Sequence, residues 1–117
     1  MRLMLLGVVM ALAGCATATV PEIQATEPIV TMQLRGEPRD AAKCVVSAIE
    51  AQERSATVRD FGAEVQVLWT APRSGTALGL FSLHKLGAGT EMQYRGRPTQ
   101  DRDAQKQLWT RLLEICR

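Results

Sequence analysis

The sequence predicts an α+β fold, a small two-layer sandwich in which a sheet of about four strands has two helices on one face. Three segments alternate apolar and polar residues, which is typical of strands with one buried face, and a fourth is strand-like but apolar on both faces at its centre. Two others repeat apolar residues at helical spacing, which is typical of amphipathic helices. The elements follow the order β-α-β-β-β-α. The first strand is expected either beside the third strand or at an edge of the sheet.

The first strand is expected within 28–35, where Val30, Met32 and Leu34 alternate with polar residues. A break at 36–38 follows, and Pro38 suits the first turn of a helix because its missing N–H would have no partner there. We expect that helix to run from Arg39 to about Arg54. Its apolar stripe comprises Ala41, Cys44, Val45, Ala48 and Ile49.

Three more strands are expected at Glu64–Thr70, Thr76–Leu86 and Thr90–Arg95, separated by turns at 71–75 and 87–89. The middle one is apolar on both faces at its centre, which indicates a central strand covered on both sides, or one that meets a partner. The last helix is expected to begin after Thr99, a plausible N-cap. Its apolar positions are Ala104, Leu108, Leu112 and Ile115, widened by Trp109, Leu113 and Cys116.

The composition argues against a nucleic-acid partner. Fourteen Lys and Arg residues face 12 Asp and Glu, so the formal charge is only +2, and aromatic residues make up 4% of the chain. Nucleic-acid binders usually carry a strong basic patch or aromatic side chains for base stacking.

The first 14 residues have the pattern of a secretory signal peptide. Arg2 is the only charge, and an apolar run covers 3–13. That run is shorter than the roughly 20 residues that a membrane-spanning helix needs, and small residues end it. The alternative is a buried N-terminal helix.

The end of this leader, Leu12-Ala13-Gly14-Cys15, resembles the lipobox of bacterial lipoproteins. The resemblance implies that the Cys15 thiol receives diacylglycerol, that the chain is cut before Cys15, and that the new amino group is acylated. Cys15 would then hold the protein in the membrane lipid, and several acyl chains make a stable anchor. The alternative is a free or disulfide-forming Cys15 thiol.

In that family, Asp after the lipidated Cys commonly retains the protein in the inner membrane. Ala16 stands there instead, which implies the outer membrane, with the domain facing the periplasm or, as the alternative, exposed at the surface. We therefore divide the chain into a removed signal peptide (1–14), the lipidated Cys with a semi-extended tether (15–27) and one α+β domain (28–117).

If Cys15 is lipidated, Cys44 and Cys116 remain. An exported protein meets an oxidising compartment, where an even pair of cysteines indicates a disulfide. Both lie on the apolar faces of their expected helices, so a bridge would join helix to helix. The alternative is two separate buried thiols.

The sequence offers few residues for catalysis, and we expect no enzyme, no cofactor and no metal site. His84 is the only histidine. Ser82 and His84 lie two residues apart on one side of a strand and form the only candidate nucleophile and base. Such pairs are common by chance, and no Gly-x-Ser-x-Gly motif accompanies this one.

Two sets of residues are candidates for binding. Arg95 and Arg97, with Arg102 nearby, form a basic corner that suits an anionic headgroup, a glycan phosphate or an acidic loop; the alternative is a solvated hairpin end. Leu78 and Leu80, with Leu86, form an apolar face that either meets a partner or packs under the tether.

These features favour a non-catalytic lipoprotein domain that binds or helps assemble another envelope protein or a cell-wall component. A periplasmic inhibitor or ligand-binding module, which would use the loop at 71–75, is the alternative. An enzyme of the cell envelope, relying on Ser82 and His84, is the least favoured of the three.

Overall fold

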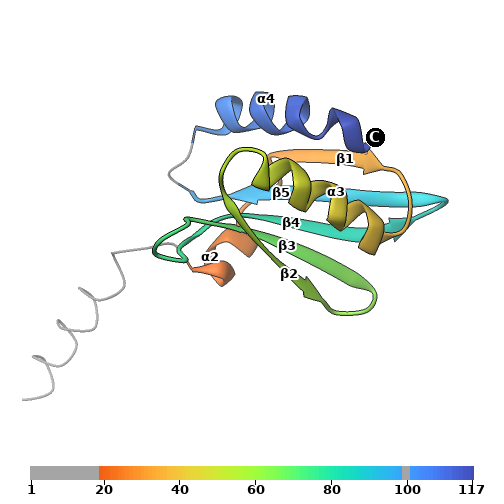
Figure 1. The fold of residues 1–117 in the computed structure, drawn as a ribbon, viewed down its shortest axis with the longest axis horizontal. Coiled ribbons are helices and arrows are strands. Elements are labelled where there is room, and N and C mark those ends of the chain that lie inside the picture. The colour runs from red at the N-terminus through yellow and green to blue at the C-terminus, as the bar shows by residue number, and fades with distance from the viewer. Residues whose placement is uncertain (1–18, 99–100) are drawn as a thin grey trace, which may run out of the picture.

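The computed structural model describes residues 19–98 and 101–117 and has an α+β fold, as predicted (Figure 1). Five antiparallel strands form one sheet in the order β1-β5-β4-β3-β2. The strands are β1 (Val30–Leu34), β2 (Ser55–Asp60), β3 (Glu64–Thr70), β4 (Ala77–Leu86) and β5 (Gly89–Gly96). The helices are α2 (Val20–Gln24), α3 (Pro38–Glu50) and α4 (Arg102–Leu112), and a short 3-10 turn, η1 (Glu114–Cys116), follows α4.

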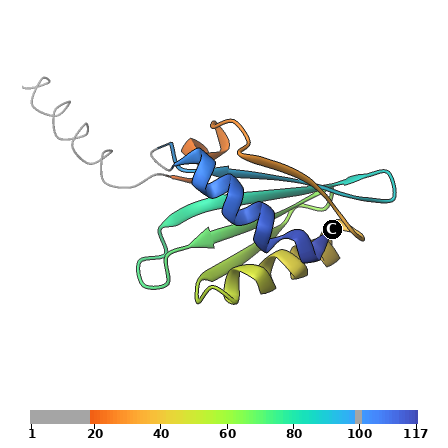
Figure 2. The same cartoon turned by 90° about the horizontal axis from the view of Figure 1, so that it is seen from above.

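Helices α3 and α4 cover one face of the sheet, whereas α2 lies on the opposite face (Figure 1). Seen from above in Figure 2, α3 and α4 lie over different parts of that face. α3 packs on β2 and β3, and α4 packs on β1. The sheet is thus covered on one side by both long helices, and only in part on the other.

The main core lies between the sheet and the two long helices, and aromatic rings fill its centre. Trp109 from α4 packs against Phe81 and Tyr94, with ring centroids 5.0 and 5.5 Å away. Gln105 Oε1 accepts hydrogen bonds from the Tyr94 hydroxyl (3.1 Å) and from Trp109 Nε1 (3.0 Å). Burial raises the pKa of the Tyr94 hydroxyl, so it stays a donor.

The Tyr94 ring packs directly against the backbone of Gly79. A Cβ atom at Gly79 would lie 2.5 Å from Tyr94 Cε1 and 3.0 Å from Trp69 Cε3. Real Cβ atoms do not approach other atoms so closely, and overpacking of a dense core is destabilising. The glycine in this central strand therefore allows two aromatic side chains to pack over its backbone.

Two elements were not expected from the sequence. β2 was missed because it is an edge strand with only two apolar residues, Ala56 and Val58, so its alternation is weak. α2 lies in the segment expected to be a semi-extended tether. Its five residues bury a single side chain, Ile23. One buried position is too few to form the apolar repeat by which a helix is predicted from sequence.

The helix boundaries also differ from the expectation. α3 starts at Pro38 but ends at Glu50 instead of near Arg54, because the chain turns at Glu53 (φ 57°) into β2. The N-cap of α4 is Asp101, whose carboxylate accepts a hydrogen bond from the Ala104 N–H (3.2 Å). The expected N-cap, Thr99, lies outside the described residues, as do the signal peptide and Cys15.

Candidate functional site

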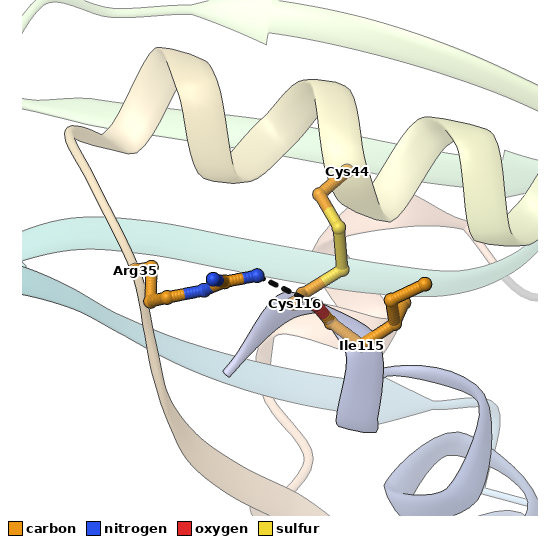
Figure 3. The surroundings of a disulfide bond; sticks show 4 residues. All are labelled: Arg35, Cys44, Ile115 and Cys116. Atoms are coloured by element: carbon orange, nitrogen blue, oxygen red, sulfur yellow. Dashed lines mark hydrogen bonds between the residues drawn. A yellow bond between two sulfur atoms is a disulfide. The ribbon is translucent and has the colours of Figure 1, made fainter.

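Cys44 and Cys116 are joined by a disulfide that links the middle of α3 to η1 (Figure 3). Their Cα atoms are 5.9 Å apart. Arg35 also contacts the C-terminal segment beside the disulfide. Its Nη2 atom donates a hydrogen bond to the Ile115 carbonyl oxygen (3.0 Å), and its backbone N–H donates one to the Cys116 carbonyl oxygen (3.0 Å). The end of the chain is therefore held to α3 by the disulfide and to Arg35, the residue after β1.

The basic corner contacts the chain's own backbone. Arg95 Nε donates a hydrogen bond to the Thr26 carbonyl (3.0 Å). Arg102 donates to the carbonyl oxygens of Pro28 (3.2 Å) and Glu27 (3.4 Å). Arg97 lies half-buried after β5. Two of the three arginines, Arg95 and Arg102, thus hold the segment that connects α2 to β1.

The apolar face expected around Leu78 and Leu80 is not an open patch. Leu80 is fully buried in a small cluster with Ile23 of α2, and Leu78 is half-buried against the main core. Only Leu86, at the end of β4, is largely exposed (46%). Of the two alternatives for Leu80, the structure shows packing under the N-terminal segment, because α2 covers the Leu80 side chain.

The candidate catalytic pair is not assembled. His84 Nε2 lies 3.3 Å from Glu91 Oε1, whereas Ser82 is buried. In the part of the chain that the structure describes, no hydrogen bond joins the Ser82 hydroxyl to the imidazole. Nor do three His, Cys, Asp or Glu side chains in residues 19–98 and 101–117 gather in a way that would hold a metal ion.

The loop at 71–75 is a compact turn closed by its own backbone. The Ala71 N–H donates a hydrogen bond to the Thr76 carbonyl (2.9 Å), and the Gly75 N–H donates to that of Ala71 (3.0 Å). Gly75 adopts a φ of 69°, which glycine allows at no steric cost. The loop is mostly exposed.

A groove of about 420 Å³ runs between α3 and β2, and we call it the α3–β2 groove. Its apolar lining comprises Ala42, Val46, Val58 and Val65. Val58, in this lining, is 50% exposed. An apolar concavity edged by a few polar groups is the usual form of a binding site.

β2 is an edge strand of the sheet, and the alternation of an antiparallel ladder shows which of its backbone groups point outward. The Phe61 N–H donates a hydrogen bond to the Glu64 carbonyl (2.9 Å), so these two form a hydrogen-bonded pair. By alternation, the pairs that include Arg59, Thr57 and Ser55 are hydrogen-bonded as well. The N–H and C=O groups of Ala56, Val58 and Asp60 therefore face away from β3.

Charged side chains line the same groove. Arg39 Nε lies 2.7 Å from Asp60 Oδ2. The pKa of Asp60 is lowered, first because the Gly62 N–H donates a hydrogen bond to its carboxylate (2.8 Å) and also because Arg39 is close. Lys43 is exposed and forms no ion pair with another described residue. Among residues 19–98 and 101–117, the groove thus combines an apolar lining with the Arg39–Asp60 ion pair and with Lys43, a cation without an ion-pair partner.

A second hollow, of about 360 Å³, lies between α3 and the C-terminal segment, beside the disulfide. Ile115, 75% exposed, stands at its border. No sheet edge and no charged side chain lines this hollow. The α3–β2 groove is therefore the more specific of the two, because backbone groups, apolar surface and charge meet there.

Comparisons with protein-family models, with curated proteins and with solved structures found no match for this chain. Among residues 19–98 and 101–117, none of the helices has both the length and the apolar character needed to cross a membrane.

Proposed function

We propose that this chain is a lipid-anchored protein of the bacterial envelope whose small domain binds another envelope component and catalyses no reaction. The α3–β2 groove carries the binding part of this proposal. It brings apolar surface, the Lys43 ammonium group and outward-facing backbone groups to one place. Such a combination suits recognition of a polymer segment.

Two observations support export and anchoring. Leu12-Ala13-Gly14-Cys15 follows a signal-like apolar run, so Cys15 is the proposed attachment point for lipid. The disulfide between Cys44 and Cys116 suits an oxidising compartment such as the periplasm, because thiols stay reduced in the cytosol. Ala16 favours the outer membrane as the destination.

Fractionation of cells that express the full chain tests the anchor. We expect the wild type in the outer-membrane fraction and Cys15→Ala outside it or uncleaved. The matched control is Cys44→Ala combined with Cys116→Ala, which removes two other cysteines and should leave the protein in the membrane. Cleaved Cys15→Ala protein in the outer-membrane fraction, at the level of the wild type, would reject the proposed anchor.

The binding part is tested separately, with a photo-crosslinking residue placed at Val58 in the groove or at Lys106 on α4. We expect a defined envelope protein or cell-wall fragment to be crosslinked from Val58 and not from Lys106. Equal crosslinking from both positions would show no preference for the groove and would contradict its proposed role.

A further inference from the structure

The exposed edge of β2 and the α3–β2 groove lie next to each other. The residues whose backbone groups face outward, Ala56, Val58 and Asp60, pair in register with Trp69, Val67 and Val65 of β3. Those three β3 residues belong to the main core. The side chains of Ala56, Val58 and Asp60 therefore lie on the helix-covered face. A strand added along β2 would place every second side chain on that face, next to α3.

We propose that the α3–β2 groove binds one extended segment of a partner protein, with alternating β-branched and acidic residues, as a sixth strand beside β2. The inference rests on the proposed binding function and names the class of partner. Addition of a peptide strand to a sheet edge gains affinity from main-chain hydrogen bonds and specificity from pockets for alternate side chains. Here the groove provides the pocket and β2 the edge.

The apolar part of the segment follows from the lining. Val58 and Val46 leave room for a branched aliphatic side chain between β2 and α3. Burying such a side chain removes apolar surface from water, which favours binding. An aliphatic residue in every second position therefore suits the side of the segment that faces the groove.

The acidic part follows from the charges. Lys43 is the cation at the groove that has no ion-pair partner among the described residues, whereas Arg39 is already paired with Asp60. Arg59, on the opposite face of β2, stacks its guanidinium on Phe61 with Cζ 5.2 Å from the ring centroid. When the aliphatic side chains face the groove, the alternate side chains of an added strand lie on the Arg59 face, so carboxylates are favoured at those positions.

A second copy of this chain fits the edge less well. Symmetric pairing of two β2 strands around Val58 would bring the same surface of each copy together. Two Lys43 ammonium groups would then approach each other on one side of the joined sheet. Like charges brought together cost free energy, so we favour an acidic partner segment.

The test uses the full lipidated chain in detergent micelles and a synthetic peptide, acetyl-Thr-Val-Glu-Val-Glu-Val-Thr-amide. Hydrogen–deuterium exchange should slow in the segment 54–61 when this peptide binds. A peptide with Lys in place of both Glu residues should bind about tenfold more weakly, as should the original peptide to Arg59→Glu, because Arg59 lies on the face that the Glu side chains meet. The matched control, Lys106→Glu on α4, should bind like the wild type.

Backbone pairing is tested by Val58→Pro, which removes an outward N–H and leaves the β2–β3 ladder its hydrogen bonds. We expect about a tenfold loss of peptide affinity, whereas Val58→Thr, which keeps the N–H and the branched shape, should bind nearly as the wild type does. Equal effects of the two substitutions would overturn strand addition.

Three further outcomes would overturn the inference. They are unchanged exchange of 54–61 with the acidic peptide, equal binding of the Lys peptide, and self-association through β2 that Val58→Pro abolishes. None of these depends on Cys15, so the membrane fractionation described above separates failure of this inference from failure of the proposed anchor.

Discussion

Arg95 donates a hydrogen bond from its Nε atom to the carbonyl oxygen of Thr26, 3.0 Å away, and ties β5 to the segment that follows α2. The Thr26 hydroxyl lies within hydrogen-bond distance of the carbonyl oxygens of Ile23 (2.7 Å) and Gly96 (3.3 Å). These contacts fix α2 where Ile23 covers Leu80. The sheet's second face is thus partly closed by a short helix near the expected membrane anchor.

Removing both guanidinium groups that hold this segment should loosen it without unfolding the domain. We expect Arg95→Ala combined with Arg102→Ala to speed hydrogen–deuterium exchange in 19–28 by about a hundredfold, since hydrogen bonds from charged donors contribute roughly 1.5–3 kcal/mol each. Arg73→Ala, in the exposed 71–75 loop, is the control. Unchanged exchange in 19–28 would show that the two arginines do not hold the segment.

Loss of the Cys44–Cys116 disulfide should strongly destabilise the domain. The two residues are separated by 72 positions, and the chain-entropy model gives about 4 kcal/mol for a closed loop of that length. Urea unfolding with and without reductant measures the difference. The double variant Cys44→Ser, Cys116→Ser should unfold at the same urea concentration as the reduced wild type. Reductant should not change that concentration. A wild type unaffected by reductant would contradict the stabilising role.

Gln105 should matter more to stability than its half-exposed position on α4 suggests. Gln105→Leu leaves the Tyr94 hydroxyl and Trp109 Nε1 without their shared acceptor. Leaving buried donors unsatisfied costs about 2 kcal/mol in the free energy of unfolding. Gln107→Leu, on the exposed side of the same helix, should cost much less. Equal effects in thermal or urea unfolding would count against this hydrogen-bond arrangement.

Asp60 should make the domain less stable in acid. Its folded pKa lies below the ordinary value of 3.8, so its stabilising contribution is present above that value and is lost as pH falls through the lower folded pKa. Asp60→Asn keeps an oxygen for the Gly62 N–H but does not titrate. Its free energy of unfolding should therefore change less between about pH 5 and about pH 2 than that of the wild type. An identical pH dependence would argue against the shift.

The elements that the sequence predicts best are those with a clear apolar period. Val30, Met32 and Leu34 form the buried face of β1, and the stripe of α3 faces the core as expected. β2 and α2 escaped prediction because each is short and buries few side chains. For these elements tertiary contacts outweigh local pattern: β2 is held by pairing with β3, and α2 by Ile23.

The candidate site was harder to predict than the fold. The α3–β2 groove joins residues near 39–47 to residues near 58–65, and no motif marks either segment. The sequence suggests Arg95 and Leu80 as binding residues, one basic and one apolar. In the structure both contact the N-terminal segment. Sequence alone does not show that α2 folds back over the sheet.

Intact-mass and peptide mass spectrometry of the protein extracted from the outer membrane test the central claim most directly. We predict a chain that begins at Cys15, carries the mass of its acyl groups there, and yields one disulfide-linked peptide pair containing Cys44 and Cys116. A full-length chain with an unmodified Met1 and an unlipidated Cys15 would contradict the claim that this is a lipid-anchored envelope protein.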